Sequence, residues 1–276
     1  SYGAQLSLSF GGFTVQPSEF VKISFVFFVA AMFYQSTDRE TIIKTTVVAA
    51  LHVLVLVLSK DLGSALIFFV AYMTMLFVAT SSYLWFGAGI AGGSLAAVAA
   101  YYLFPHVRRR VEAWADPWSD IANKGYQVAQ ALFAIGTGGW FGQGLYKGQP
   151  SKTPEVIMDC IFTAVCEELG GIIGICLILI CIACLLMFIA VAAELYLPFY
   201  KLIGIGLTAI YGTQVFLTIG GGIKFIPLTG VTLPLVSYGG SSVLSTFIIF
   251  GIMQELYIKR QNEVERLERI KERVHY

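Results

Sequence analysis

Seven stretches of the sequence are each long and apolar enough to cross a lipid bilayer. A spanning helix needs about 20 mostly apolar residues. Of the 276 residues, 57% are hydrophobic and only 13% are charged, whereas a soluble domain has about 25% charged residues. The sequence therefore predicts an all-α polytopic integral membrane protein. The expected spans are residues 18–35, 41–58, 62–80, 84–104, 160–192, 198–220 and 241–258.

A long polar segment, residues 105–158, separates the fourth expected span from the fifth. Within it, YQVAQALFAIG is amphipathic and too short to span, so we expect it to lie at the membrane interface. The tail, residues 259–276, is dense in Lys and Arg, and basic flanks favour the cytoplasmic side. The pattern predicts a transmembrane domain at 1–258, with 105–158 as a large extracytoplasmic loop, followed by a charged cytoplasmic tail.

Counting seven spans back from a cytoplasmic C-terminus places the N-terminus outside the cell. Ser1 is not an initiator methionine, and no signal peptide precedes the first span. We therefore expect that helices which precede this chain in the complete protein are absent from it.

Two ionisable side chains lie at the start of the first expected span. Glu19 and Lys22 are three residues apart, so they share a helix face and are able to pair. Ser18 and Glu19 also suit a helix N-terminus, but that alternative does not account for a lysine one turn into an apolar helix. Because ionisable residues inside a membrane usually serve function, we favour a site.

Three carboxylates stand at the leading end of the fifth expected span. Asp159 opens that helix, where a carboxylate also stabilises the positive end of the helix dipole. Glu167 and Glu168 follow two turns later, and we expect them to be buried and hydrogen-bonded, orienting the neighbouring loops. The three arginines Arg108–Arg110 lie on the expected outer side, where an anionic ligand would account for them.

The glycines of GTGGWFGQG could cradle a phosphate through their backbone N–H groups. No Walker-type lysine and serine follow, however, so a flexible or re-entrant backbone is the favoured interpretation.

Five sequence blocks follow one another along the chain: QPSEFVK, KDLGSAL, RVEAWADPWSD with GYQVAQALFAIGTGGWFGQGL, PEVIMDCIF with EELG, and IPLTGVTLPLVSYGGSS. In this order they resemble the SEDS family (shape, elongation, division and sporulation proteins, the RodA, FtsW and SpoVE group). The resemblance implies ten spanning helices with both ends cytoplasmic, of which about seven are present here.

The resemblance also implies a function. Such proteins are peptidoglycan glycosyltransferases that polymerise lipid II on the outer face of the bacterial cytoplasmic membrane, for cell shape, division or sporulation. They work with a class B penicillin-binding protein, and no nucleic acid is expected as a partner. The catalytic aspartate of the family falls on Asp159, although Met158 and Cys160 replace the Thr and Phe of its usual motif.

The residue pattern and the resemblance together assign roles. Asp159 is the expected general base, which takes a proton from the acceptor hydroxyl while undecaprenyl pyrophosphate leaves the donor sugar. A divalent cation, Mg²⁺ or Mn²⁺, is the candidate cofactor, and no metal ligand is assigned. Substrate binding is expected of Glu19, Lys22, Arg109, Arg110, Ser237 and Ser241, and orienting roles of Glu167, Glu168, Asp116 and Gln16.

Two other functions are compatible with the sequence. A flippase or transporter for lipid-linked precursors would also have charge pairs and broken helices inside the membrane, but its polar residues should line both leaflets rather than one. A non-catalytic scaffold for a class B penicillin-binding protein is the third interpretation, and it leaves the buried charges without a purpose.

Overall fold

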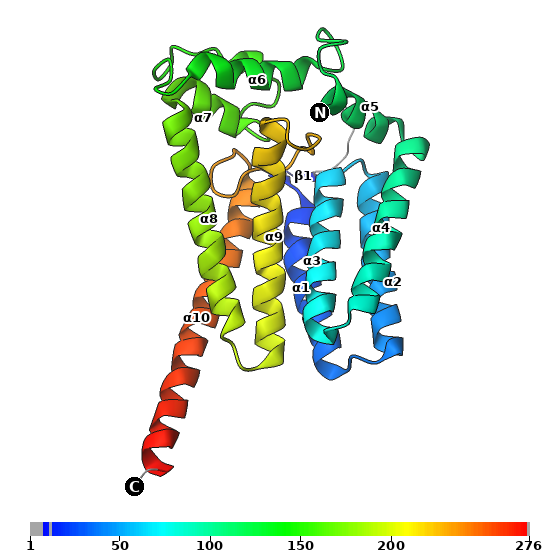
Figure 1. Ribbon diagram of the computed structural model, residues 1–276, viewed down its shortest axis with the longest axis vertical. Coiled ribbons are helices and arrows are strands. Elements are labelled where there is room, and N and C mark those ends of the chain that lie inside the picture. The colour runs from blue at the N-terminus through cyan, green and yellow to red at the C-terminus, as the bar shows by residue number, and fades with distance from the viewer. Residues whose placement is uncertain (1–7, 11–12, 275–276) are drawn as a thin grey trace.

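The computed structural model describes residues 8–10 and 13–274, with side chains for residues 15–266. Seven helices in this part of the chain are long and apolar enough to cross a membrane, which confirms the expected multi-pass architecture. They form an upright bundle (Figure 1). The spanning helices are α1 (Pro17–Gln35), α2 (Arg39–Leu58), α3 (Leu62–Thr80), α4 (Tyr83–Leu103), α8 (Gly171–Ala193), α9 (Pro198–Gly222) and α10 (Gly240–Val274).

The remaining elements gather at one end of the bundle, here called the loop end (Figure 1). Helix α6 runs across the bundle axis there, as expected for an interfacial helix. Residues 105–158 thus contain regular structure rather than an open loop. The elements are the antiparallel hairpin of β1 (Leu8–Phe10) and β2 (Phe13–Val15), then α5 (Pro105–Ala115), α6 (Tyr126–Gly138), the short 3₁₀ helix η1 (Pro150–Lys152) and α7 (Ile161–Leu169).

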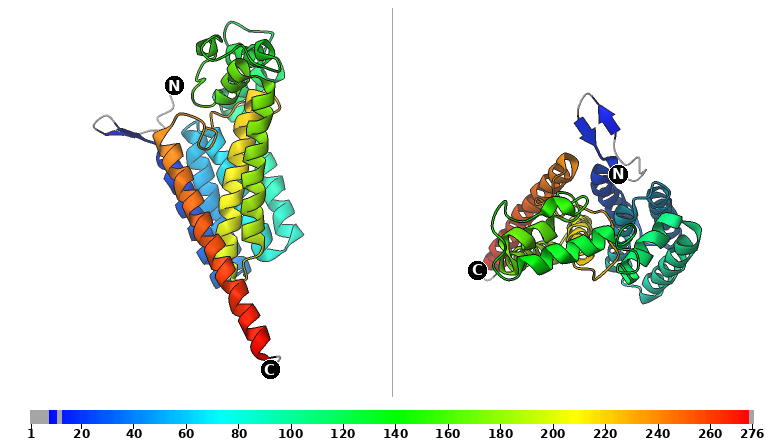
Figure 2. Two further views of the ribbon diagram at one scale, coloured as in Figure 1. Left: turned by 90° about the vertical axis from the view of Figure 1, so that its left-hand side faces the viewer. Right: turned by 90° about the horizontal axis from the view of Figure 1, so that it is seen from above.

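Helix α9 is the centre of the bundle and packs against α1, α3 and α8 (Figure 2). Glycines on its surface allow this close approach. A Cβ on Gly206 would lie 2.7 Å from both Met75 on α3 and Val26 on α1, so a larger residue would push the helices apart. Glu19 and Lys22 on α1 and Gln214 on α9 are buried within the bundle.

The turns between the first helices are fixed by aspartate caps. Asp38 accepts a hydrogen bond from the backbone N–H of Thr41 at the start of α2. Asp61 does the same for Ser64 at the start of α3, over 3.0 Å. Each carboxylate satisfies an N–H group that has no partner within its helix. Asp61 is thereby held at the loop end, close to α5.

The expected span at 160–192 is wrong in one respect, because two helices occupy it. α7 ends at Leu169 and α8 begins at Gly171, with Gly170 between them at φ +91°. A Cβ on Gly170 would lie only 2.4 Å from the Trp140 carbonyl oxygen. The loop after α6 therefore packs into the joint, which only glycine permits. The break escaped prediction because apolar residues lie on both sides of Glu167, Glu168 and Gly170, so hydropathy alone indicates one long run.

Helix α10 continues without a break from the bundle into the charged tail. It extends beyond the other helices at the end opposite the loop end (Figures 1 and 2). The division between a transmembrane domain and a tail at residue 258 thus falls inside one helix and stays a prediction.

Candidate active site

Asp159 lies in the turn that precedes α7, at the loop end of the bundle. Only 8% of its surface is exposed. The side-chain amide of Gln127, on α6, donates to both carboxylate oxygens over 3.4 Å. Burial raises the pKa of Asp159 to about 6, nearby Glu155 adds to the rise, and Arg110 and Gln127 oppose it. Asp159 is therefore a stronger base than an ordinary aspartate and is still mostly ionised at neutral pH.

The guanidinium of Arg110, on α5, enters the same region. Its Nη1 donates to the carbonyl oxygen of Thr229 over 2.6 Å and to that of Leu228 over 3.4 Å. The next residue, Gly230, has φ +79°, and a Cβ there would lie 3.7 Å from Nη2 of Arg110 and 3.9 Å from Oδ2 of Asp159. The cation and the acid therefore face one small space above Gly230. None of the ion pairs between described side chains joins them.

The loop that follows α9 holds the turn that bears the carboxylate. The hydroxyl of Ser237 donates to the carbonyl oxygen of Met158 and accepts a hydrogen bond from the N–H of Leu233 over 2.7 Å. The N–H of Tyr238 donates to the carbonyl oxygen of Ile157 over 2.8 Å. Ser237, which was expected to bind substrate, thus has two partners inside the protein and supports the backbone beside the acid.

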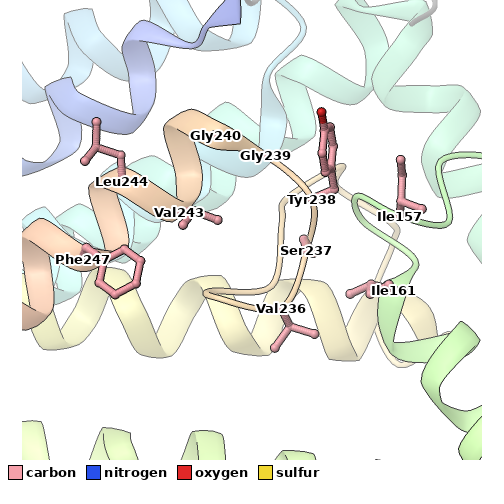
Figure 3. Close-up of a pocket in the computed structure, with 10 residues that line it drawn as sticks. All are labelled: Ile157, Ile161, Val236, Ser237, Tyr238, Gly239, Gly240, Val243, Leu244 and Phe247. Carbon is pink, nitrogen blue, oxygen red and sulfur yellow. The ribbon is translucent and has the colours of Figure 1, made fainter.

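An apolar groove of about 600 Å³ opens next to this turn. Figure 3 shows side chains of α10 on one side, Ile157 and Ile161 on the other, and the loop through Ser237 between them. Nearly all of the lining is hydrocarbon, so the groove suits a lipid chain rather than a polar molecule. The lining residues are Ile157, Ile161, Val236, Ser237, Tyr238, Gly239, Gly240, Val243, Leu244 and Phe247.

Glu19 and Lys22 form a buried ion pair in the bundle, 2.6 Å apart. Ser245 donates a second hydrogen bond to the carboxylate of Glu19 over 2.7 Å. The ammonium of Lys22 also donates to Gln214 over 2.8 Å, and the amide of Gln214 donates to the carbonyl oxygen of Thr232 over 3.0 Å. A chain of hydrogen bonds therefore connects the ion pair to the loop after α9, which contains Gly230.

The other two residues expected to bind substrate lie elsewhere. Arg109 is exposed on α5, one position around the helix from Arg110. The hydroxyl of Ser241 accepts a hydrogen bond from the backbone N–H of Gln16 over 3.0 Å, which joins the start of α10 to the start of α1. Gln16 also donates from its side chain to Ser18 over 3.2 Å. These contacts agree with an orienting role for Gln16.

The remaining carboxylates hold backbone at the loop end. Asp116 caps the end of α5 and accepts from the N–H two residues on, over 3.1 Å. Glu167 accepts from the N–H of Gln149 over 2.8 Å, and Glu168 from the N–H of Tyr146 over 3.2 Å. The geometry therefore suits the orienting roles expected of all three, and it separates Glu167 and Glu168 from the acid–arginine pair.

Sequence reasoning missed four residues of this region. Gln127 donates hydrogen bonds to the carboxylate of Asp159, and Gly230 leaves space between that carboxylate and Arg110. Gln214 transmits the position of the buried ion pair, and Asp61 lies near enough to Arg110 to raise its pKa, against the lowering effect of burial. A glutamine inside an apolar helix is a recognisable signal, so Gln214 could have been found. The other three depend on contacts between distant segments.

The donor set offers little to a resident metal ion. Among the described residues, no three His, Cys, Asp or Glu side chains come together as ligands would. Mg²⁺ is often held by one or two carboxylates together with substrate phosphates. Asp159 could supply one such ligand, but Arg110 already places a positive charge beside it. The divalent cofactor stays a prediction.

Comparisons with known proteins agree with the sequence motifs. The family model for FtsW, RodA and SpoVE, described as "Cell cycle protein", matches residues 1–262. "Peptidoglycan glycosyltransferase RodA" of Mycobacterium tuberculosis strain H37Rv is 34% identical over 271 residues, which cover 92% of this chain and 58% of that protein. "Probable peptidoglycan glycosyltransferase FtsW" of Tolumonas auensis is 33% identical over 272 residues, which cover 94% of this chain and 70% of that protein.

Solved structures share the fold. A structure described as "Structural coordination of polymerization and crosslinking by a peptidoglycan synthase complex" aligns with a TM-score of 0.74 and 24% identity, over 94% of this chain and 75% of that one. The rod shape determining protein RodA of Thermus thermophilus aligns with a TM-score of 0.65 and 23% identity, over 94% and 71% of the two chains. This chain spans 58% of the length of the mycobacterial RodA. The family model and the FtsW relative establish that the chain belongs to the FtsW/RodA/SpoVE family of cell cycle proteins.

Proposed function

We propose that the complete protein is a peptidoglycan glycosyltransferase that polymerises lipid II, and that this chain carries its general base. One observation carries the proposal. A buried carboxylate, Asp159, and a guanidinium, Arg110, face the same space above Gly230. Relatives that are about one third identical are named peptidoglycan glycosyltransferases, which supports the same reaction here.

The reaction assigns each charge a task. Asp159 takes the proton from the 4-hydroxyl of the acceptor GlcNAc as that oxygen forms a bond to the anomeric carbon of the donor MurNAc. The bond from that carbon to the pyrophosphate oxygen breaks, and undecaprenyl pyrophosphate leaves with the electron pair. Arg110 stabilises the negative charge that develops on it. General-base catalysis of this kind typically accelerates a reaction by about 10² to 10⁴-fold.

Lys22 acts from a greater distance than the arginine. Its ammonium is buried and bonded to Glu19 and Gln214, so it fixes the loop around Gly230 instead of meeting the pyrophosphate directly. Arg109 is exposed on the same helix as Arg110 and is available to guide the charged headgroup toward the site.

The apolar groove beside the acid gives one substrate a path to the site. A lipid-linked sugar must present its reactive carbon or hydroxyl at the membrane surface while its polyprenyl chain stays in hydrocarbon. The groove between α10 and Ile157 opens next to the turn that bears Asp159, and its lining suits the first isoprene units of such a chain.

The reaction requires the loop end to lie on the extracytoplasmic side of the bacterial cytoplasmic membrane. The C-terminus of α10 then lies in the cytoplasm, because α10 leaves the bundle at the opposite end, as its basic residues favour. A class B penicillin-binding protein is the proposed partner, since glycan strands must be cross-linked as they form.

Reconstitution of the complete protein with its partner in vesicles, with labelled lipid II, tests the function. Chains of labelled disaccharide are the expected product, and their absence from a correctly folded complex would contradict the proposal. Lipid II that changes leaflet without being polymerised would indicate a flippase. A complex that only stimulates transpeptidation of pre-made glycan would indicate a scaffold.

A further inference from the structure

The loop after α6 exposes four large apolar side chains outside the spanning helices. Trp140 is 67% exposed, Phe141 85%, Leu145 62% and Tyr146 95%. We call residues 140–146 the aromatic loop. When side chains of this size leave water, the free energy falls by about 25 cal/mol per Å² of apolar surface removed from water. Four such side chains exposed within seven residues therefore indicate a surface that meets something other than water.

The aromatic loop is held rigidly on the end of α7. The N–H groups of Gln143 and Gly144 donate to the carbonyl oxygens of Glu167 and Glu168, each over 2.9 Å. The carboxylate of Glu168 also accepts from the N–H of Tyr146 over 3.2 Å. Tyr146 has φ +62°, a conformation that is costly for a residue other than glycine. The Glu168 carboxylate thus fixes a strained backbone that turns the ring of Tyr146 outward.

The depth of the loop is set by α8. The N–H of Gly171 donates to the carbonyl oxygen of Gly139 over 2.8 Å, and the N–H of Ile172 donates to that of Trp140 over 3.3 Å. α8 has 23 residues, and at about 1.5 Å per residue it exceeds the roughly 30 Å thickness of the hydrocarbon core. Its first turn, and Trp140 with it, therefore lies at the boundary between headgroups and acyl chains.

We propose that the aromatic loop is a lipid anchor, in which Trp140, Phe141, Leu145 and Tyr146 enter the headgroup region and the upper acyl chains. Trp and Tyr prefer this region because each combines an apolar ring with a polar group. Exposed Lys147 follows at once, where its ammonium can meet lipid phosphate. This inference concerns the lipid around the protein and does not depend on the proposed reaction.

The anchor also fixes the height of the acid-bearing turn. Glu167 and Glu168, which hold the loop, end the same helix α7 that Asp159 precedes. A loop seated in the interface therefore keeps α7 at a constant depth relative to the lipid headgroups.

Fluorescence quenching in vesicles tests the anchor. The purified protein and its Trp140→Phe variant are reconstituted without partner proteins in phosphatidylcholine that carries bromine either near the carbonyl end or near the methyl end of the acyl chains. The difference between their spectra isolates Trp140. We expect bromine near the carbonyl end to quench this difference at least twofold more than bromine near the methyl end, and aqueous iodide to have little effect.

Two outcomes would overturn the proposal. Quenching of the Trp140 signal by iodide but not by bromolipid would place the loop in water, free for a soluble domain of a partner protein. Protection from both quenchers would mean that protein covers it. Trp114→Phe is the matched control. The indole N–H of Trp114 donates to the carbonyl oxygen of Lys224 over 3.2 Å, so its difference signal should respond weakly to both quenchers.

A second variant tests whether the loop side chains hold the position. Phe141→Ser with Tyr146→Ser leaves Trp140 in place but removes two other exposed apolar side chains of the aromatic loop. Bromolipid quenching of Trp140 should fall at least twofold if the loop is an anchor. Unchanged quenching in this variant would contradict the anchor role, whatever the result for the parent protein.

Discussion

Nη2 of Arg110 and Oδ2 of Asp159 approach the same point, the position that a Cβ would occupy on Gly230, to within 3.7 and 3.9 Å. The two side chains come from opposite ends of the segment 105–160, and the glycine comes from the loop after α9. Only a residue without a side chain leaves this space open to a substrate. The arrangement leads to tests of the space, of the acid and of the buried ion pair behind it.

Filling the space should stop the reaction without removing either charge. Gly230→Val would put methyl groups between Arg110 and Asp159 at a backbone φ of +79°. We expect the rate of lipid II polymerisation to fall at least tenfold, as measured by gel separation of labelled glycan.

The control for backbone strain is Gly139→Ala. Gly139 also has a positive φ, +56°, but nothing lies within 4 Å of its Cβ position. This variant should polymerise at close to the parent rate. Equal losses in both variants would mean that strain at the glycine, rather than occupation of the space, causes the defect.

The pH dependence of the rate should report the burial of Asp159. Because burial raises the pKa of Asp159 to about 6 and a general base must be ionised, the rate should rise as pH rises through about 6. Below that value it should fall by about tenfold per pH unit. Initial rates across this range, in vesicles whose integrity is checked at each pH, provide the measurement.

Replacing Gln127 should shift the midpoint of this pH–rate profile. The Gln127 amide lowers the pKa of Asp159 by a hydrogen bond to the carboxylate. Gln127→Leu removes that bond, so the midpoint should shift to higher pH, whereas the exposed Gln261→Leu on α10 should leave it unchanged. A loss of rate with no shift of the midpoint would show that Gln127 supports structure but does not tune the acid.

The ion pair of Glu19 and Lys22 should behave as a buried pair in stability measurements. Lys22→Met leaves the Glu19 carboxylate without its cation and should cost about 3–5 kcal/mol of stability. Adding Glu19→Gln should recover at least half of this loss, because no unpaired charge then remains. Thermal unfolding in detergent, followed by a thiol-reactive dye or by light scattering, gives the comparison.

Lys44→Met is the matched control, since Lys44 pairs with Glu40 but both side chains are more than 60% exposed. It should leave the unfolding temperature close to that of the parent, because solvent screens an exposed pair. A double variant at 19 and 22 that is no more stable than Lys22→Met alone would contradict the account of the pair.

The ionised carboxylate of Asp159 should also lower the free energy of unfolding near neutral pH. Its pKa in the folded state, about 6, lies above the ordinary value of 3.8, so ionisation opposes folding above about pH 6 and this cost disappears as pH falls toward 3.8. A shift of this size corresponds to roughly 3 kcal/mol. Asp159→Asn should therefore raise the unfolding temperature near neutral pH, with a smaller gain in acid. A lower unfolding temperature for this variant at neutral pH would contradict the burial effect.

The membrane helices were predictable because their signal is local. Each span is a run of apolar residues, and all seven expected spans begin within two residues of a helix in the structure. The span 160–192 differs because it contains two helices, and hydropathy does not reveal a break at Gly170 that depends on Trp140 packing against it.

The site was predictable only in part. The sequence pointed to Glu19, Lys22, Arg110 and Asp159 because charges are rare in such a chain. It could not indicate that Lys22 is bonded inside the bundle while Arg110 faces the acid. That distinction depends on which distant segments meet, and neither composition nor spacing contains it.

The rate of lipid II polymerisation by the Asp159→Asn protein, reconstituted with its partner beside the parent, tests the central claim most directly. The account predicts a folded and stable complex whose rate is lower by at least about 10²-fold, the smallest typical contribution of a general base. Glycan made at the parent rate by the folded Asp159→Asn protein would contradict it.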